Sequence, residues 1–185
     1  MENDFVFFFG GVLGPSQGLD MVIEAAAAFK NAPEVKFLFV GDGTAKPFLE
    51  KIVADKGVKN IIFKPFVSAE EYPALVKEMD VCFATLTSKN TTPAVPAKLM
   101  GYMAAGRPVV MAVHKESDAI RIVNEAHCGF TAVSNNQEAV TDAFRRAYNS
   151  KGSLAELGAN GSKYLSEHFS KEKLVAEWND LIKKI

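Results

Sequence analysis

Lys98 is the residue whose type and predicted position best suit chemistry on a bound ligand. It lies in the first turn of a short helix predicted over 97–105, within the stretch TTPAVPAKLMGYMAAGRPVV. A helix N-terminus carries partial positive charge, so a lysine there is locally unfavourable and is a better functional candidate than an ordinary surface lysine. The ammonium and the free N–H groups of the first turn together suit an anion such as phosphate. The alternative, a solvated lysine at one of the many turns of an α/β fold, stays open.

Other candidate residues lie in loops that follow apolar, strand-like runs. One such run ends at Gly10 and Gly11, and the next ends at Gly41 and Asp42. Glycines at these points permit tight turns and close backbone approach to a ligand. The first group does not have the spacing of the dinucleotide fingerprint GxGxxG and shares only its placement after a strand. The remaining loops of this kind are 66–67 and the Ser/Thr-rich loop 85–96.

The sequence lacks the motifs of several other catalytic classes. It contains no HExxH or Walker pattern, and no serine or cysteine in a nucleophile elbow. The three histidines are scattered, and only His114, just past a predicted strand and beside Lys115, is placed to touch a ligand. Cys82 and Cys128 lie in apolar surroundings far apart in sequence, which predicts buried reduced thiols of a cytoplasmic protein rather than a metal site.

Apolar runs and amphipathic stretches alternate along the chain. Strands are predicted over 5–9, 35–40, 61–63, 80–84, 109–113 and 128–133, and helices over 21–30, 45–56, 68–79, 97–105, 116–125 and 136–149, with two more helices after them. This rhythm predicts a Rossmann-like α/β fold, a parallel sheet of about six strands with helices on both faces. Ligands of such sheets bind at the C-terminal strand ends, where the candidate loops gather.

Two helices carry further signals. Ser68 and Glu71 form a predicted capping box at the start of the helix that runs to Met79. The final helix begins after Ser170 and has an apolar stripe at helical spacing, which we expect to be buried: Leu174, Val175, Trp178, Leu181 and Ile182.

Composition limits the function classes. Hydrophobic residues make up 48% of the chain and charged residues 23%, as in an ordinary globular domain. The net charge of −1 gives no electrostatic footprint for nucleic acid or an anionic membrane. No apolar run approaches the length of a membrane span, and the N-terminus does not resemble a signal peptide. The chain begins almost directly on a strand, so we expect residues 1–185 to form one domain cut from a longer cytoplasmic protein.

The order of motifs resembles that of a known family. A glycine turn followed by GLDMVIEAA, then FLFVGDG, then NIIFKPFVSAEEYPALVKEMDV, then PAKLMGYMAAGRPVV, is similar to the C-terminal, donor-binding half of retaining GT-B glycosyltransferases. The similarity is closest to family 4 members that build bacterial surface polysaccharides, and it covers nearly the whole chain. It implies a nucleotide-diphosphate sugar as donor, a missing N-terminal acceptor domain, a glycan or lipid-linked acceptor and no metal cofactor. It also implies peripheral contact of the full-length protein with the inner membrane face.

The resemblance assigns roles to particular residues. The glycines approach the donor diphosphate, the 41–42 turn lies near the site, and 66–67 lies against the nucleobase. The start of the 97–105 helix and the loop before it contact the donor, with Lys98 as the cation that stabilises the leaving diphosphate. The residues so implied are Gly10, Gly11, Gly14, Gln17, Gly41, Asp42, Phe66, Val67, Thr92, Pro93, Ala94, Val95 and Lys98.

This chain departs from the family pattern at three positions. The lysine that usually neutralises the diphosphate is replaced by Gln17, and the family's paired glutamates fall at Pro93 and Gly101. These departures favour a second interpretation, a degenerate, non-catalytic domain with a structural or regulatory role. A nucleotide-sugar epimerase would need a carboxylate and histidine array that the sequence lacks, and a flavodoxin-like or NAD-binding domain would need its fingerprint.

Overall fold

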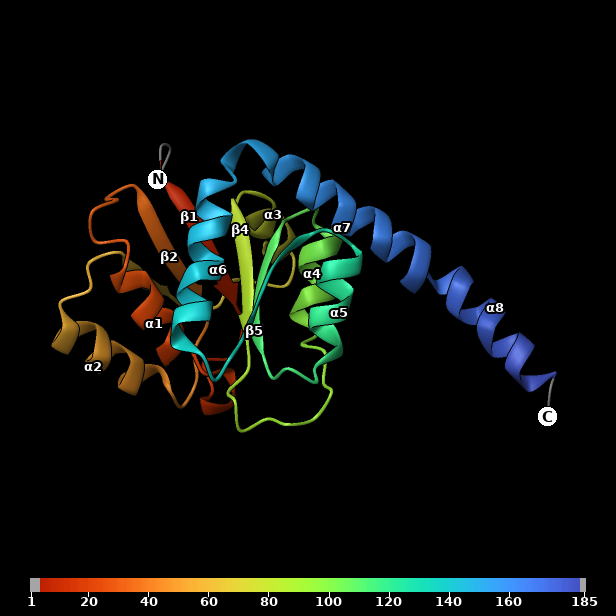
Figure 1. Ribbon diagram of the computed structural model, residues 1–185, viewed down its shortest axis with the longest axis horizontal. Helices are drawn as coiled ribbons and strands as arrows, with labels where there is room; N and C mark the ends of the chain where they lie inside the picture. Colours follow the sequence, from red (N-terminus) through yellow and green to blue (C-terminus); the bar gives the residue numbers. More distant parts are fainter. Residues whose placement is uncertain (1–3, 184–185) are drawn as a thin grey trace.

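The computed structural model describes residues 4–183 and has at its centre a sheet of six parallel strands (Figure 1). The strands are β1 (Phe5–Gly10), β2 (Val35–Val40), β3 (Ile61–Lys64), β4 (Val81–Thr85), β5 (Val109–Val113) and β6 (Gly129–Val133). Their order across the sheet is β3-β2-β1-β4-β5-β6. The predicted sheet is confirmed, and each predicted strand matches an observed one to within a residue or two.

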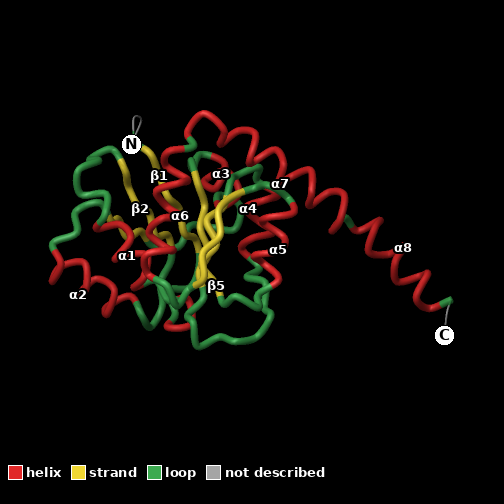
Figure 2. The backbone as a smooth tube through the Cα atoms, viewed as in Figure 1, coloured by secondary structure: helices red, strands yellow, loops and turns green. Residues whose placement is uncertain are grey.

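Helices cover both faces of the sheet (Figure 2). They are α1 (Asp20–Ala27), α2 (Lys46–Lys56), α3 (Tyr72–Lys77), α4 (Lys98–Ala104), α5 (Asp118–Glu125), α6 (Gln137–Asn149), α7 (Leu154–Phe169) and α8 (Lys171–Ile182), with short 3-10 turns at Pro15–Gln17 and Lys151–Ser153. One core lies under α1, α2 and α6, and the other under α3, α4 and α5. This two-sided cover explains why the strands are continuous apolar runs rather than alternating ones.

The strand β1 shows how the sequence builds both cores. All of its side chains are buried, and successive residues point to opposite faces of the sheet. Phe7 stacks on Phe37 at a centroid distance of 4.8 Å in the first core, whereas Phe8 packs edge-on to Tyr102 at 6.3 Å in the second. Such aromatic pairs add to the stabilisation from burial. The aromatic run therefore fixes β1 at the middle of the molecule.

The chain reverses its direction of progress across the sheet between β1 and β4. From β1 it moves outward to β2 and β3, and then it crosses back to β4 and proceeds to β5 and β6. In open α/β sheets, ligands bind at the carboxyl ends of the strands where the chain reverses in this way. The loop between β4 and α4 sweeps around this end of the molecule (Figure 1).

The predicted helix over 68–79 is only partly correct. The capping box forms as predicted: Glu71 N–H donates to Ser68 Oγ at 3.2 Å, and Ser68 N–H donates to Glu71 Oε2 at 3.0 Å. The regular helix, however, covers only Tyr72–Lys77. Pro73 has no N–H to donate to the carbonyl four residues earlier, so the helix does not extend back to the box.

The prediction that the stripe on the last helix is buried is wrong. Its side chains are 42–64% exposed, and α8 projects from the body as a continuation of α7 (Figure 1): Leu174, Val175, Trp178, Leu181 and Ile182. Within residues 4–183, neither of the two hydrophobic cores includes a side chain of α8. Within the same residues, no helix is both long and apolar enough to cross a membrane.

Candidate functional site

The glycines after β1 and β2 bring two loops into backbone contact. Gly11 N–H donates to the Val40 carbonyl at 2.9 Å, which continues the strand pairing into the loops. A Cβ atom at Gly41 would lie 1.9 Å from the Gly11 carbonyl oxygen, so only glycine fits there. Gly14, in contrast, has room for a side chain. Gly11 and Gly41 therefore approach each other closely, while Gly14 only precedes the turn Pro15–Gln17; the approach of these glycines to a ligand stays a prediction.

Lys98 extends from the start of α4 over the loop after β1, residues 10–14, which we call the glycine loop. Its ammonium nitrogen lies 3.2 Å from Gln17 Oε1 and 4.8 Å from the centre of the Phe9 ring. A Cβ atom at Gly11 would come within 2.7 Å of Lys98 Cε, so the lysine stem lies directly against that glycine. The side chain is half-buried, and burial lowers the pKa of its ammonium. Within residues 4–183, no carboxylate forms an ion pair with Lys98.

Gln17 is itself fixed by the loop after β4. Thr85 Oγ1 donates to the Gln17 carbonyl at 2.5 Å, and Thr87 N–H donates to the Ser16 carbonyl at 2.9 Å. These bonds attach the turn after β1 to the end of β4. The loops after β1 and β4 are thus joined by hydrogen bonds next to the Lys98 ammonium.

The helix that carries Lys98 is short. It spans seven residues and ends before Gly106, which has the positive φ of 66° that is typical of a helix stop. Pro96 precedes the helix, and its carbonyl accepts from Leu99 N–H at 2.9 Å. The side chain of Lys98, rather than the dipole of a long helix, supplies the positive charge here.

A hollow of about 380 Å³ lies beside Lys98, at the ends of β1, β2 and β3. We call it the glycine hollow, and its lining residues are Gly10, Gly11, Val40, Phe66, Val67, Ser68, Ala69 and Tyr72. Phe66 is 55% exposed, which is unusual for a phenylalanine, while Val67 packs against the core below. The structure therefore brings together Gly10, Gly11, Phe66 and Val67, which are far apart in sequence.

Sequence reasoning did not identify two tyrosines next to the glycine hollow. Tyr102 is buried and accepts a hydrogen bond from Gly10 N–H at 3.2 Å, and Tyr72 forms part of the lining. Both had the pattern of ordinary apolar helix positions. The only available signal was the pair of aromatic residues predicted to lie on helices flanking the glycine loop.

Several predicted residues lie outside these contacts. Asp42 is exposed; its Oδ1 accepts from Gly43 N–H at 2.7 Å, and it does not cap α2, whose N-cap is Ala45. The loop residues 92–95 line none of the hollows described here, and the Ala94 carbonyl accepts from Ser117 Oγ at 2.6 Å. His114 Nδ1 accepts locally from Glu116 N–H at 3.3 Å.

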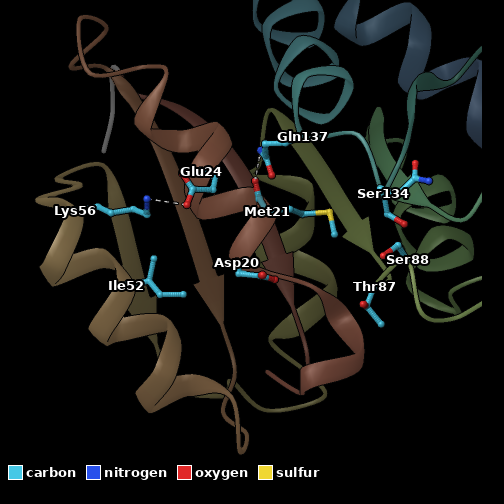
Figure 3. Close-up of a pocket in the computed structure, with 10 residues that line it drawn as sticks. Asp20, Met21, Glu24, Ile52, Lys56, Thr87, Ser88, Ser134 and Gln137 are labelled. Carbon is cyan, nitrogen blue, oxygen red and sulfur yellow. Dashed lines mark hydrogen bonds and ion pairs between the residues drawn. The ribbon is translucent and has the colours of Figure 1, made fainter.

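A second hollow, of about 460 Å³, lies between α1, α2 and the loops after β4 and β6 (Figure 3). We call it the α1–α2 hollow. Its lining includes Thr87 and Ser88 of the candidate loop 85–96 but none of the individually predicted donor-site residues. The lining residues are Asp20, Met21, Glu24, Ile52, Lys56, Thr87, Ser88, Ser134, Asn135 and Gln137. Lys56 pairs with Glu24 at 2.8 Å, and Gln137 Nε2 donates to the Met21 carbonyl at 2.9 Å. Within residues 4–183, the buried Ser134 hydroxyl has no partner.

The comparison with known families places this parallel sheet and its loops among described proteins. The family model described as glycosyl transferases group 1 matches residues 1–164. The chain belongs to this family. The putative colanic acid biosynthesis glycosyl transferase WcaI of Escherichia coli is 35% identical over 111 residues, which are 60% of this chain and 27% of the relative. The poly(ribitol-phosphate) alpha-N-acetylglucosaminyltransferase of Staphylococcus aureus is 23% identical over 168 residues, 90% of this chain and 33% of that protein.

Solved structures share the fold. Anabaena HepE, solved in complex with UDP, superposes with a TM-score of 0.80 at 20% identity, over 99% of this chain and 50% of that one. The C-terminal domain of a group 1 glycosyl transferase, LpcC of Francisella tularensis, superposes with a TM-score of 0.73 at 20% identity, over 91% and 87% of the two chains. The predicted Rossmann-like half of a GT-B fold is confirmed. The chain spans a third or less of the length of the curated relatives named above.

The two positions at which the family has glutamates, 93 and 101, are both exposed in this structure. Pro93 is exposed in the loop before α4, and Gly101 is exposed on α4. A Cβ atom at Gly101 would meet nothing within 4 Å. The fold therefore does not forbid a carboxylate at position 101, and its absence is a property of this sequence.

Proposed function

We propose that this chain is the donor-binding domain of a retaining glycosyltransferase. In this proposal the enzyme transfers a sugar from a nucleotide-diphosphate sugar to a glycan or lipid-linked acceptor during surface-polysaccharide synthesis. The observation that carries the proposal is the half-buried Lys98 ammonium, which lies over the glycine loop and has an amide oxygen in place of a carboxylate partner. A partly desolvated cation without a counter-ion favours binding of an anion.

The geometry fits the departure of a nucleoside diphosphate. In the transfer, the bond between the anomeric carbon and the diphosphate oxygen breaks, and its electron pair stays on the leaving diphosphate. A new bond joins the anomeric carbon to the acceptor oxygen, whose proton passes to the leaving diphosphate. Lys98 would stabilise the negative charge that develops on the diphosphate, in surroundings with less water than the surface. Because a lysine supplies this charge, we expect donor binding without a metal ion, and EDTA should leave it unchanged.

The glycine hollow supports a nucleoside next to the diphosphate. The exposed ring of Phe66 offers a face on which a base can stack, and Val67 forms apolar lining beside it. The hollow and Lys98 share Gly11, so one ligand can reach both. The names of the relatives support a role in polysaccharide synthesis, and UDP is the first nucleotide to test because HepE was solved with it.

The part of the relatives that this chain does not match would bind the acceptor. The curated relatives named above are about three or more times longer than the matched segment. We therefore propose that an N-terminal acceptor domain faces the carboxyl ends of the strands and that residues 1–185 alone do not catalyse transfer. A lipid-linked acceptor would bring the full-length protein to the inner face of the membrane.

Calorimetric titration of the chain with UDP, GDP and their sugars tests the proposal. We expect a dissociation constant in the micromolar to millimolar range for one base. Replacing Lys98 by alanine removes a charge-assisted hydrogen bond of about 1.5–3 kcal/mol and should weaken binding roughly 10- to 100-fold. Lys115→Ala, which removes an exposed lysine outside the site, is the matched control. Failure of the folded protein to bind any of these nucleotides would contradict a working donor site.

A second candidate function rests on the lost glutamates. With Pro93 and Gly101 in their places, the domain has no carboxylate at either position, which favours a degenerate domain with a structural or regulatory role. The two functions differ in one assay. Sugar transfer by the full-length protein, abolished by Lys98→Ala, supports the enzyme; nucleotide binding and transfer both absent support the degenerate domain.

A further inference from the structure

Gly10, at the end of β1, starts a directed chain of hydrogen bonds. Its N–H donates to Tyr102 Oη at 3.2 Å. A backbone N–H can only donate, so the Tyr102 oxygen accepts and its own proton must point elsewhere. Tyr102 is 1% exposed, so this proton needs an acceptor inside the protein.

Tyr72, on α3, provides that acceptor. A Cβ atom at Gly10 would lie 2.6 Å from Tyr72 Oη, which places this hydroxyl directly above the glycine. The rings of both tyrosines pack on Phe8, with centroid distances of 6.1 Å for Tyr72 and 6.3 Å for Tyr102. Burial raises the pKa of both hydroxyls. Their mutual hydrogen bond lowers the pKa of Tyr72 and raises that of Tyr102.

The hydroxyl proton of Tyr72 is the free end of this chain of hydrogen bonds. Tyr72 is half-buried and lines the glycine hollow, and within residues 4–183 its hydroxyl donates to no protein acceptor. The direction of the chain is fixed at its buried end by Gly10, so the free end is a donor. An oxygen atom of a ligand in the hollow would complete the chain.

We propose that Tyr72 donates a hydrogen bond to an oxygen of the nucleoside, on the ribose or the base, and is a specificity-determining residue of the donor site. The inference rests on the proposed function. Tyr72 lies over Gly10 on the side of Phe66, whereas Lys98 lies over Gly11. A nucleotide spanning the two glycines, with its phosphates at the cation, places its nucleoside at the tyrosine.

Tyr72→Phe separates the two ends of the ligand, because it keeps the ring on Phe8 and removes only the oxygen. We expect the dissociation constant for UDP to rise about three- to tenfold, the usual effect of one neutral hydrogen bond. Binding of uridine should weaken by a similar factor, and binding of pyrophosphate should not change. Lys98→Ala should show the opposite pattern: UDP and pyrophosphate should bind more weakly, and the affinity for uridine should change little. Titration with 2′-deoxy-UDP then assigns the contact: an equal Tyr72→Phe effect on both nucleotides indicates the base or another ribose oxygen.

Tyr148→Phe is the matched control, since it removes a tyrosine hydroxyl that bonds to Glu34 in the other core. Unchanged UDP affinity in Tyr72→Phe would overturn the inference, and so would equal weakening of UDP and pyrophosphate. Failure of the wild-type chain to bind nucleotides would instead overturn the proposed function. The melting temperature of each variant shows whether it is folded in the assay.

Discussion

Two hollows open among the loops that follow the strands, and their polar groups differ in how far they are already satisfied. In the larger α1–α2 hollow, Lys56 pairs with Glu24 at 2.8 Å, and Gln137 donates to a backbone carbonyl. Around the smaller glycine hollow, Lys98 has one amide partner, and Tyr72 keeps a proton to donate. Volume would favour the first hollow, which also holds the unpartnered hydroxyl of Ser134, whereas the half-buried ammonium of Lys98, with no carboxylate partner within residues 4–183, favours the second. The comparison teaches that pairing, more than size, indicates where a ligand is expected.

The backbone contact under the glycine hollow gives the largest expected effect. In Gly41→Ala, the new Cβ atom would meet the Gly11 carbonyl oxygen at 1.9 Å, and both groups belong to the backbone, so neither can rotate away. We expect a loss of at least about 3 kcal/mol in the free energy of unfolding. Urea denaturation measures it. Gly101→Ala, in open space on α4, is the control and should stabilise the protein by about 0.5–1 kcal/mol. Equal stability of the two variants would contradict the close packing of the loops.

Exchanging the residues at positions 98 and 17 tests whether UDP binding needs only a positive charge at this point or needs that charge to come from α4. Lys98 Nζ lies 3.2 Å from Gln17 Oε1, so a lysine at either position can bring its ammonium to nearly the same point. We expect Lys98→Gln to weaken UDP binding roughly tenfold or more and the double variant Lys98→Gln with Gln17→Lys to recover most of that loss. Calorimetry on the wild type, both single variants and the double variant completes the cycle. A double variant no better than Lys98→Gln would show that only the path from α4 delivers the charge correctly.

The sequence predicted the sheet well because buried parallel strands are long apolar runs bounded by glycines, as in Phe5–Gly10. The roles of Lys98, Gly11 and Phe66 stay predictions: Lys98 was singled out as a cation in the first turn of a helix, and the other two by their places after strands and by the family resemblance. Tyr72 and Tyr102 were missed because their function depends on a contact with Gly10 across the fold, which no local pattern records. The α8 stripe was misjudged for a related reason: helical spacing shows that a face is apolar but not that residues 4–183 contain a surface to cover it.

The pH dependence of the glycine hollow should have opposite signs for binding and for stability. Burial lowers the pKa of Lys98 in the folded free protein. UDP binding therefore weakens several-fold as the pH rises through that lowered value, in the interval below the ordinary lysine pKa, because the ammonium loses its proton. The unfolded chain holds the same proton more tightly, so this residue makes the free protein more stable as the pH rises over the same interval. That contribution is complete above the ordinary lysine pKa and is lost as the pH falls through the lowered one.

Lys98→Met is the variant that isolates these slopes. It removes the titrating group, so the fall in affinity and the associated gain in stability with rising pH should both be absent from the variant, and the difference between wild type and variant measures them. Titration calorimetry and urea denaturation at matched pH values measure the two slopes. If the affinity of the wild type stays level over that interval while the variant binds more weakly at every pH, Lys98 acts through packing rather than through its charge.

The smallest effect is expected in the α1–α2 hollow, where the charges are already paired. Lys56 and Glu24 are both partly exposed, with 44% and 42% of their side-chain surface accessible, so their ion pair is screened by water and contributes less than about 1 kcal/mol. The variants Lys56→Met and Glu24→Gln should each change the free energy of unfolding by less than that amount and leave the UDP dissociation constant unchanged. The double variant should be close to the sum of the two. Loss of UDP affinity in either single variant would show that the larger hollow takes part in nucleotide binding, and pairing of charges would then no longer distinguish the two hollows.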